Sequence, residues 1–172
     1  LNPGANGAAW FVDSVRLVDG PDAEIAALGG LDTKTVAVVD KPFASLVENV
    51  APAADSAARI AMTEYRVNLQ RYEYTAAAPG VAVFSEIYYP KGWTAYLDGV
   101  EAPYFRADYV LRAMVLPAGT HTVEFRFRAP HYELLSSLTL ISSLLLLGGV
   151  AAVAGAAGYR AYKKRKDNDG QQ

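Results

Sequence analysis

LLSSLTLISSLLLLGGVAAVAGAAGY, residues 134–159, contains no Asp, Glu, Lys or Arg and is followed by Arg160 and the basic cluster KKRK at residues 163–166. A helix rises about 1.5 Å per residue, so this run reaches roughly 37 Å, whereas the hydrocarbon core of a bilayer is about 30 Å thick. A buried helix of a soluble protein is the alternative, and the length disfavours it. The run follows 133 other residues, so it is not a signal peptide. We predict a transmembrane helix over residues 132–159 and a basic tail over residues 160–172.

The distribution of charge predicts the orientation of this helix. The chain carries 16 Lys and Arg and 18 Asp and Glu, and five of the basic but only two of the acidic residues lie after Leu134. Residues 1–133 therefore have a net charge of −5, which argues against nucleic acid as a partner. Short basic flanks prefer the cytoplasmic side, so the tail is expected inside and residues 1–131 outside, although Arg126 and Arg128 oppose this trend.

Short segments rich in β-forming residues, separated by turn residues, occupy most of the chain before the apolar run. Asp98-Gly99 is a dipeptide typical of tight two-residue hairpin turns. Six or more strands at this spacing predict a mainly β domain over residues 1–131, an antiparallel β-sandwich of the jelly-roll or immunoglobulin-like type. The predicted strands are 10–18, 35–40, 60–69, 70–77, 81–89, 93–97, 100–105, 109–116 and 121–128, with a helix at 22–28 and a connection at 41–58. The last strand leads into the apolar run through Ala129-Pro130, so we expect the domain close to the membrane surface.

The stretch FSEIYYPKGWTAY, residues 84–96, concentrates aromatic side chains that can stack on sugar rings. Acidic side chains nearby can accept hydrogen bonds from sugar hydroxyl groups. The predicted glycan contacts are Glu86, Tyr89, Trp93, Tyr96 and Asp98. The alternative is that these aromatic residues, Trp93 above all, belong to the core, because large aromatic side chains dominate the cores of small sandwiches. The alternation of their strands predicts Tyr89 and Tyr96 as the exposed ones.

Three charged residues, Arg106, Asp108 and Arg112, surround one predicted turn. They could hold an anionic or sugar-phosphate ligand, or they could form a structural ion pair that fixes the loop.

Small residues recur four apart in the second half of the apolar run, at Gly148, Ala152, Gly155 and Ala156. This spacing allows another helix to approach closely, so we predict packing against other transmembrane helices. The alternative is that Gly and Ala are simply common in membrane helices.

No cysteine is present, which excludes disulfides, thiolate metal sites and thiol catalysis. The sequence holds no phosphate-cradling Gly-rich loop, zinc motif or nucleophile elbow, and no pair of carboxylates stands out as acid and base. We predict no catalytic residue, metal or cofactor within this chain.

Two motifs, YYPKGWTAYLDG at residues 88–99 and AGTHTVEF at residues 118–125, together with the apolar helix, resemble the C-terminal part of YfhO-type bacterial membrane proteins. The resemblance covers nearly the whole chain and is most specific at residues 85–99 and 106–127. It implies a longer parent protein, in which a multi-span region similar to GT-C glycosyltransferases precedes an extracytoplasmic β-domain and a final transmembrane helix. The chain also begins at Leu1 without an initiator Met, which suggests a piece of a longer polypeptide.

The resemblance implies a function in which lipid-linked sugars are transferred to cell-envelope polymers at the bacterial cytoplasmic (inner) membrane. The chain itself would be a non-catalytic accessory domain with its anchor, and the parent protein the glycosyltransferase. Its partners would be the lipid bilayer, the other transmembrane helices of the parent, and a cell-envelope glycan or lipid-linked sugar. Two alternatives remain: a purely structural or interaction module of envelope assembly, and a free-standing single-pass receptor-like protein.

Overall fold

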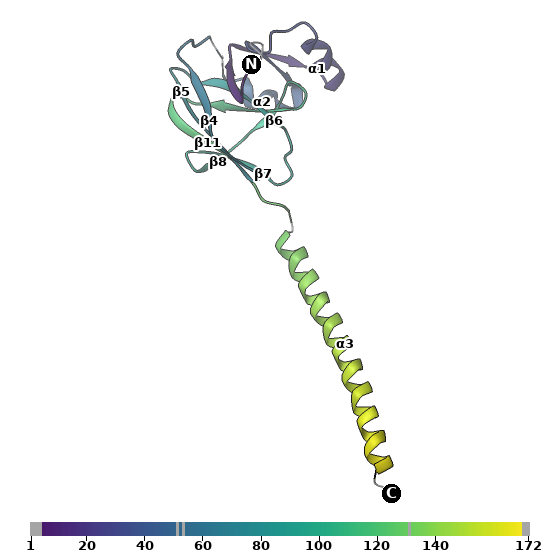
Figure 1. Cartoon of the computed structure of the whole chain (residues 1–172). Coiled ribbons are helices and arrows are strands. Elements are labelled where there is room, and N and C mark those ends of the chain that lie inside the picture. Colours follow the sequence, from purple (N-terminus) through teal and green to yellow (C-terminus); the bar gives the residue numbers. More distant parts are fainter. Residues whose placement is uncertain (1–4, 51, 53, 131, 170–172) are drawn as a thin grey trace. The chain divides into compact units, whose positions relative to one another are not determined.

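The computed structural model describes residues 5–50, 52, 54–130 and 132–169, and the chain divides into two compact units, residues 1–128 and 129–172 (Figure 1). The first unit is mainly β. Its strands are β1 Ala9–Val12, β2 Ser14–Val18, β3 Val36–Asp40, β4 Arg59–Arg66, β5 Leu69–Ala76, β6 Gly80–Ile87, β7 Trp93–Leu97, β8 Val100–Ala102, β9 Phe105–Ala107, β10 Leu111–Leu116 and β11 Gly119–Phe127. Its helices are α1 Pro21–Leu28, the short 3-10 helix η1 Lys41–Phe43 and α2 Ala44–Val47.

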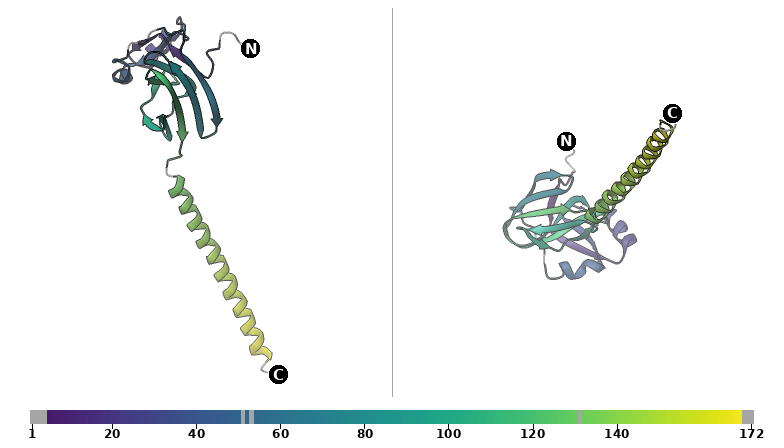
Figure 2. Two further views of the ribbon diagram at one scale, coloured as in Figure 1. Left: turned by 90° about the vertical axis from the view of Figure 1, so that its left-hand side faces the viewer. Right: turned by 90° about the horizontal axis from the view of Figure 1, so that it is seen from below.

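Two antiparallel sheets form most of this unit. One has four strands in the order β1-β6-β10-β9, and the other has five in the order β4-β5-β11-β7-β8. Strands β4, β5 and β11 lie side by side in the five-stranded sheet (Figure 2). The sheets share one buried cluster, in which the rings of Tyr72, Phe84 and Phe125 pack edge to face with centroids 4.9 to 6.3 Å apart. Such edge-to-face packing is the arrangement that aromatic quadrupoles favour.

A second buried cluster joins the four-stranded sheet to the parallel pair β2-β3 and to α2. It contains Val12, Ala37, Val39, Val47, Val81, Val83, Phe105, Ala107 and Ala113. Strand β6 is buried along Gly80–Phe84 because its successive side chains enter the two clusters alternately. The four-stranded sheet is therefore covered on both faces.

The single strand predicted over residues 10–18 is wrong, because the chain changes sheets at Asp13. The N–H groups of Asp13 and Ser14 both donate to the carbonyl of Thr35, at 2.7 and 3.1 Å. This bend leaves β1 paired with β6 and starts β2 parallel to β3. β-Forming residues lie on both sides of the bend, so the sequence pattern merges the two strands, although Asp13 and Ser14 are residue types typical of turns.

Two further predictions require correction. The segment predicted as a connection, residues 41–58, holds η1 and α2, with Pro42 in the first turn where a proline needs no hydrogen bond. The return strand predicted over residues 100–105 ends at Ala102. After Pro103 the chain leaves the five-stranded sheet, and β9 pairs with β10 in the other one.

The second unit consists of the helix α3, Tyr132–Asp169. By length and composition its segment Leu135–Arg160 can span a membrane, and its most apolar part is not buried in the protein. The helix continues beyond the predicted span, so the tail predicted over residues 160–172 includes its last turns. Residues 170–172 of that tail, like residues 1–4, lie outside the described part.

Candidate functional site

Trp93, the central residue of the predicted glycan surface, is the first residue of β7 and is half-buried against the inter-sheet cluster. The guanidinium carbon of Arg112 lies 4.3 Å from the centroid of its ring, and the ring of Phe127 lies 5.3 Å away. A cation above an aromatic face is attracted by the ring quadrupole. The Trp93 ring is thus engaged by internal contacts.

Tyr96 lies three residues further along β7, on the face of the strand opposite to Trp93. The guanidinium carbon of Arg126 lies 4.6 Å from its ring centroid. Tyr89 is 51% exposed and belongs to the loop between β6 and β7. The hydroxyl of Tyr104 donates to the carbonyls of Tyr89 and Trp93, at 3.3 Å each, and so ties both ends of this loop together.

Glu86 lies on β6, in the other sheet, and its charge acts on Arg112, the cation over the Trp93 ring. Asp98 follows the last residue of β7, in the turn to β8. The five predicted glycan residues therefore do not all lie together. The loop between β6 and β7 brings Tyr89 and Trp93 together, while Tyr96 lies on the other face of β7 and Asp98 beyond its end. Glycan contact at these residues stays a prediction. Tyr89 is exposed, as predicted, whereas the prediction that Tyr96 is exposed is wrong: Tyr96 is half-buried like Trp93, with the Arg126 guanidinium against its ring.

Asp98 has a structural role in a lock between two turns. One carboxylate oxygen lies 2.6 Å from Nδ1 of His121, and the other accepts the N–H of Thr122 at 2.9 Å. Nε2 of His121 lies 3.0 Å from the carbonyl of Ala118. Asp98 has a φ of 50°, which the tight turn with Gly99 requires. The lock joins the two motifs on which the family resemblance rests.

These contacts change the acid–base properties of the pair. The Thr122 N–H first and then the His121 ring hold the pKa of Asp98 below its usual value. The Asp98 carboxylate first and then the Ala118 carbonyl raise the pKa of His121. Gly119 is required beside them, because its φ is 121° and a Cβ would lie 2.6 Å from Nε2 of His121. The lock is therefore strongest when His121 is charged.

Arg112 is 2% exposed and lies within the inter-sheet region. Its Nε donates to the carbonyl of Ile87 at 2.9 Å, and one terminal nitrogen donates to Oε1 of Gln70 at 2.8 Å. The ring of Phe125 lies 5.0 Å from its guanidinium carbon. Burial lowers the pKa of Arg112. Among the described residues, no carboxylate lies within 4.0 Å of its guanidinium group, so neutral acceptors and aromatic faces hold this cation.

Arg106, by contrast, is paired with carboxylates. One terminal nitrogen lies 3.0 Å from Oε2 of Glu24 and 3.4 Å from Oδ2 of Asp40. Glu24 is fully buried on α1, and its other oxygen accepts the N–H of Tyr109 at 2.8 Å. The pair joins α1 and β3 to the turn between β9 and β10.

Asp108 lies in that turn with a φ of 49°, and its Oδ1 accepts the N–H of Val38 at 2.8 Å. Its Oδ2 is buried and has no hydrogen-bond partner among the described residues. Burial, with a smaller contribution from the nearby Glu24, raises the pKa of Asp108 to about 6, although the N–H of Val38 acts in the opposite direction. The three residues predicted as one cluster, Arg106, Asp108 and Arg112, thus have separate partners.

Sequence reasoning missed two parts of these sites. Glu24 lies 82 residues from Arg106 and was assigned only to the start of a helix. On the solvent face of the five-stranded sheet, Arg71 joins Glu64 and Glu124, at 2.8 and 2.7 Å. The alternation in β11 places Glu124 on that face, but the pairing of β5 with β11 was needed to find Arg71.

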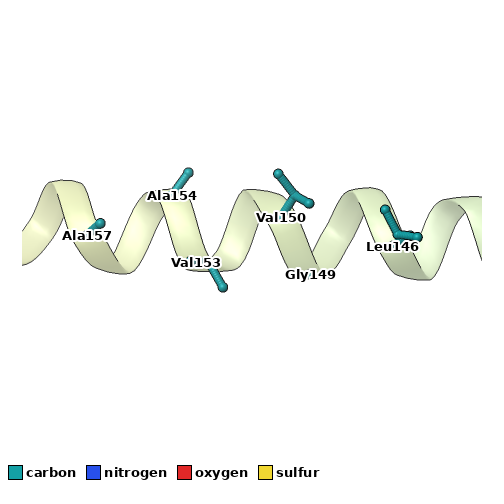
Figure 3. A pocket seen from close by; sticks show the side chains of 6 residues that line it. All are labelled: Leu146, Gly149, Val150, Val153, Ala154 and Ala157. Atoms are coloured by element: carbon teal, nitrogen blue, oxygen red, sulfur yellow. The ribbon is translucent and has the colours of Figure 1, made fainter.

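The predicted helix-packing residues Gly148, Ala152 and Gly155 share one face of α3, since each residue advances about 100° around a helix. The opposite face carries a shallow apolar groove of about 570 Å³ (Figure 3). It is lined by Leu146, Gly149, Val150, Val153, Ala154 and Ala157. The helix therefore presents two different apolar faces, and its packing stays a prediction.

No group of three or more His, Asp or Glu side chains within the described residues could hold a metal ion. Comparisons with protein-family models, with curated proteins and with solved structures find no match to this chain. The resemblance to YfhO-type proteins consequently stays a prediction.

Proposed function

We propose that this chain is a membrane-anchored accessory domain of a YfhO-like protein that acts in the transfer of lipid-linked sugars to cell-envelope polymers. The β-unit would be an antiparallel sandwich of the jelly-roll or immunoglobulin-like type. It would lie outside the bacterial cytoplasmic membrane, with the basic end of α3 in the cytoplasm. The domain would bind or position the cell-envelope polymer, and the parent protein would catalyse the sugar transfer.

The observation that carries this proposal is the junction of a well-packed β-unit with the apolar segment Leu135–Arg160 of α3. An apolar helix of this length is most stable in a bilayer. The β-unit has two buried clusters of its own. Together these features favour a folded domain held at a membrane by its helix.

The alternative of a purely structural module is favoured by a specific observation. Trp93 packs against Arg112 and Phe127, and Asp98 is bound to His121. Both residues therefore have internal roles that explain the two motifs without any glycan. If a glycan is bound, it would contact Tyr89 or Tyr96.

Cysteine labelling tests the anchoring and its orientation, because this chain has no cysteine of its own. Ser85→Cys, on the exposed side of β6, and Lys163→Cys, near the end of α3, would be introduced separately into the gene in its native host. A membrane-impermeant maleimide should label position 85 in intact cells and position 163 only after permeabilisation, as read by peptide mass spectrometry. The reverse pattern, or equal labelling of both, would contradict the proposal.

Calorimetric titration of the full chain in detergent micelles with envelope oligosaccharides tests the choice between glycan contact and structure. Stacking on an aromatic ring contributes about 0.5–1.5 kcal/mol, so Tyr89→Ala or Tyr96→Ala should weaken saturable binding about threefold to tenfold. Tyr65→Ala, which removes an exposed ring from β4, is the matched control and should leave binding unchanged. No saturable binding by the folded chain would favour the structural module.

A further inference from the structure

A groove of about 660 Å³ crosses the end of the five-stranded sheet where β11 finishes. Its wall includes Arg66 at the end of β4, and Arg126, Phe127 and Arg128 at the end of β11. The side chains of Asn68, Thr94 and Tyr96 complete most of the remaining lining. No described residue that lines it is acidic, although residues 1–133 have a net charge of −5.

The arginines of the groove share their carboxylate partners with a third arginine. Arg66 lies 2.6 Å from Glu64, and Arg126 forms an ion pair with Glu124. These two carboxylates also bind Arg71, on which the charge of Glu73 acts as well. Arg128 also lines the groove. The side chains of Arg66 and Arg126 are 69% and 51% exposed, which leaves them accessible to an external anion.

The rest of the wall is suited to a phosphate ester. Arginine donates in a planar fork that matches phosphate oxygens, and the amide of Asn68 and the hydroxyl of Thr94 can add neutral hydrogen bonds. The rings of Tyr96 and Phe127 offer apolar surface for the carbon atoms of a head group. The groove floor is fixed, because the N–H of Phe127 donates to the carbonyl of Asn68 and the N–H of Arg128 to that of Gly92.

Chain connectivity identifies the source of the phosphate. Arg128 precedes Leu135, the first residue of the apolar segment, by only seven residues, and seven residues extend to at most ~25 Å. If α3 crosses a bilayer, the groove is therefore always within reach of lipid head groups. We propose that this groove docks on the phosphate groups of anionic phospholipids in that bilayer. The inference rests on the membrane anchoring proposed above and adds a lipid-binding role for the β-unit.

The test uses the full chain in lipid nanodiscs, made either of phosphatidylcholine alone or of an equimolar mixture with phosphatidylglycerol. A spin label at Val67→Cys, in the exposed turn between β4 and β5, reports on the groove end of the sheet. A label at Val100→Cys, also exposed and the first residue of β8 at the other end of the sheet, is the control. Phosphatidylglycerol should produce a slow, lipid-contacting spectral component at position 67 only.

Arginine variants test whether the groove charges cause docking. A basic residue near an anionic surface contributes about 1 kcal/mol, so each removed charge should lower the ratio of docked to free label about fivefold. Arg66→Gln and Arg126→Gln should act in this way, whereas Arg66→Lys should retain most of the effect. Arg59→Gln, at the other end of β4, is the control for net charge. Circular dichroism would verify that each variant is folded.

Each remaining outcome decides against one part of the inference. Equal spectra at position 67 in both nanodiscs, or equal responses at positions 67 and 100, would overturn lipid docking by the groove. Displacement of the docked component by inorganic phosphate at low concentration would show a site for free phosphate and overturn the lipid assignment. Failure of the chain to enter nanodiscs at all would instead contradict the anchoring on which the inference rests.

Discussion

Arg106 and Arg112 face each other across the β9–β10 ladder, yet the protein accommodates the two cations in opposite ways. Arg106 binds the carboxylates of Glu24 and Asp40. Arg112 binds a carbonyl, an amide oxygen and two aromatic rings, and no carboxylate among the described residues. The first arrangement neutralises charge, whereas the second disperses it over neutral and polarisable groups.

The difference shows what each arginine does for the fold. Removing one partner of a buried ion pair leaves the other as an unpaired buried charge. Removing a cation from neutral acceptors leaves only unsatisfied hydrogen-bond groups, which is less unfavourable. Arg106 thus fixes α1 and β3 to the sheet edge, while Arg112 positions the Trp93 ring beneath the β6–β7 loop.

The largest effect is expected for Arg106→Ala, which leaves the fully buried carboxylate of Glu24 without its cation. We expect a loss of about 3 kcal/mol in the free energy of unfolding at neutral pH. Urea unfolding of the full chain in micelles measures it, with the exposed Arg16→Ala as a control that should change little. A loss no larger than that of Arg112→Ala would contradict the comparison.

Arg112→Ala should lower the free energy of unfolding less, by about 2 kcal/mol. It leaves the carbonyl of Ile87 and the side-chain oxygen of Gln70 without a donor, but it leaves no buried ion-pair partner unpaired. Arg112→Lys keeps the charge but lacks the planar fork, so we expect an intermediate loss. The same urea titration, followed by the fluorescence of Trp93, measures both variants. Unaltered fluorescence would contradict the proposed positioning of the ring.

Asp108→Asn should stabilise the protein at neutral pH. Burial raises the pKa of Asp108 from 3.8 to about 6, so this group favours folding below the lower value and loses that contribution as pH rises through the higher one. A neutral amide keeps the acceptor for Val38 and avoids burying a charge, so we expect a gain of about 1 kcal/mol at pH 7. The melting temperature of Asp108→Asn should change less with pH across this range than that of the parent protein. The control Asp13→Asn, which alters an exposed carboxylate, should keep the pH dependence of the parent.

The smallest effect is expected at the exposed lock between Asp98 and His121. The raised pKa of His121 means that its contribution is present below about 6.5 and is lost as pH rises through its folded value. The lowered pKa of Asp98 means that its contribution is lost as acid protonates it. His121→Gln should therefore lower the melting temperature more at about pH 6 than at about pH 9. A larger effect in alkali would contradict the charged lock.

Local patterns predicted the elements whose residues lie close together in the sequence. The alternation in residues 121–128 identified β11, Asp98-Gly99 identified the β7–β8 turn, and the uncharged run identified α3. Each signal is complete within a short stretch, because the residues that form the turn or the buried face are neighbours along the chain.

Partners distant in the sequence could not be predicted in this way. The parallel pairing of β2 with β3 depends on a bend at Asp13 and on a partner strand that begins only at Val36. Glu24 and Arg106 belong to different layers and meet only after the sheet has formed. The sequence also grouped Arg106 with Arg112, which are cross-strand neighbours but have no hydrogen-bond or ion-pair partner in common.

The position of β11 has a mechanical consequence. This strand leads to α3 and lies between β5 and β7, bonded to β5 over eight residue pairs and to β7 over five. A pull transmitted through the anchor therefore loads an internal strand, whose hydrogen bonds on both sides share the force in parallel. An edge strand such as β8 has a hydrogen-bonded neighbour on one side only. The anchor is thus attached to a strand that the sheet holds from both sides.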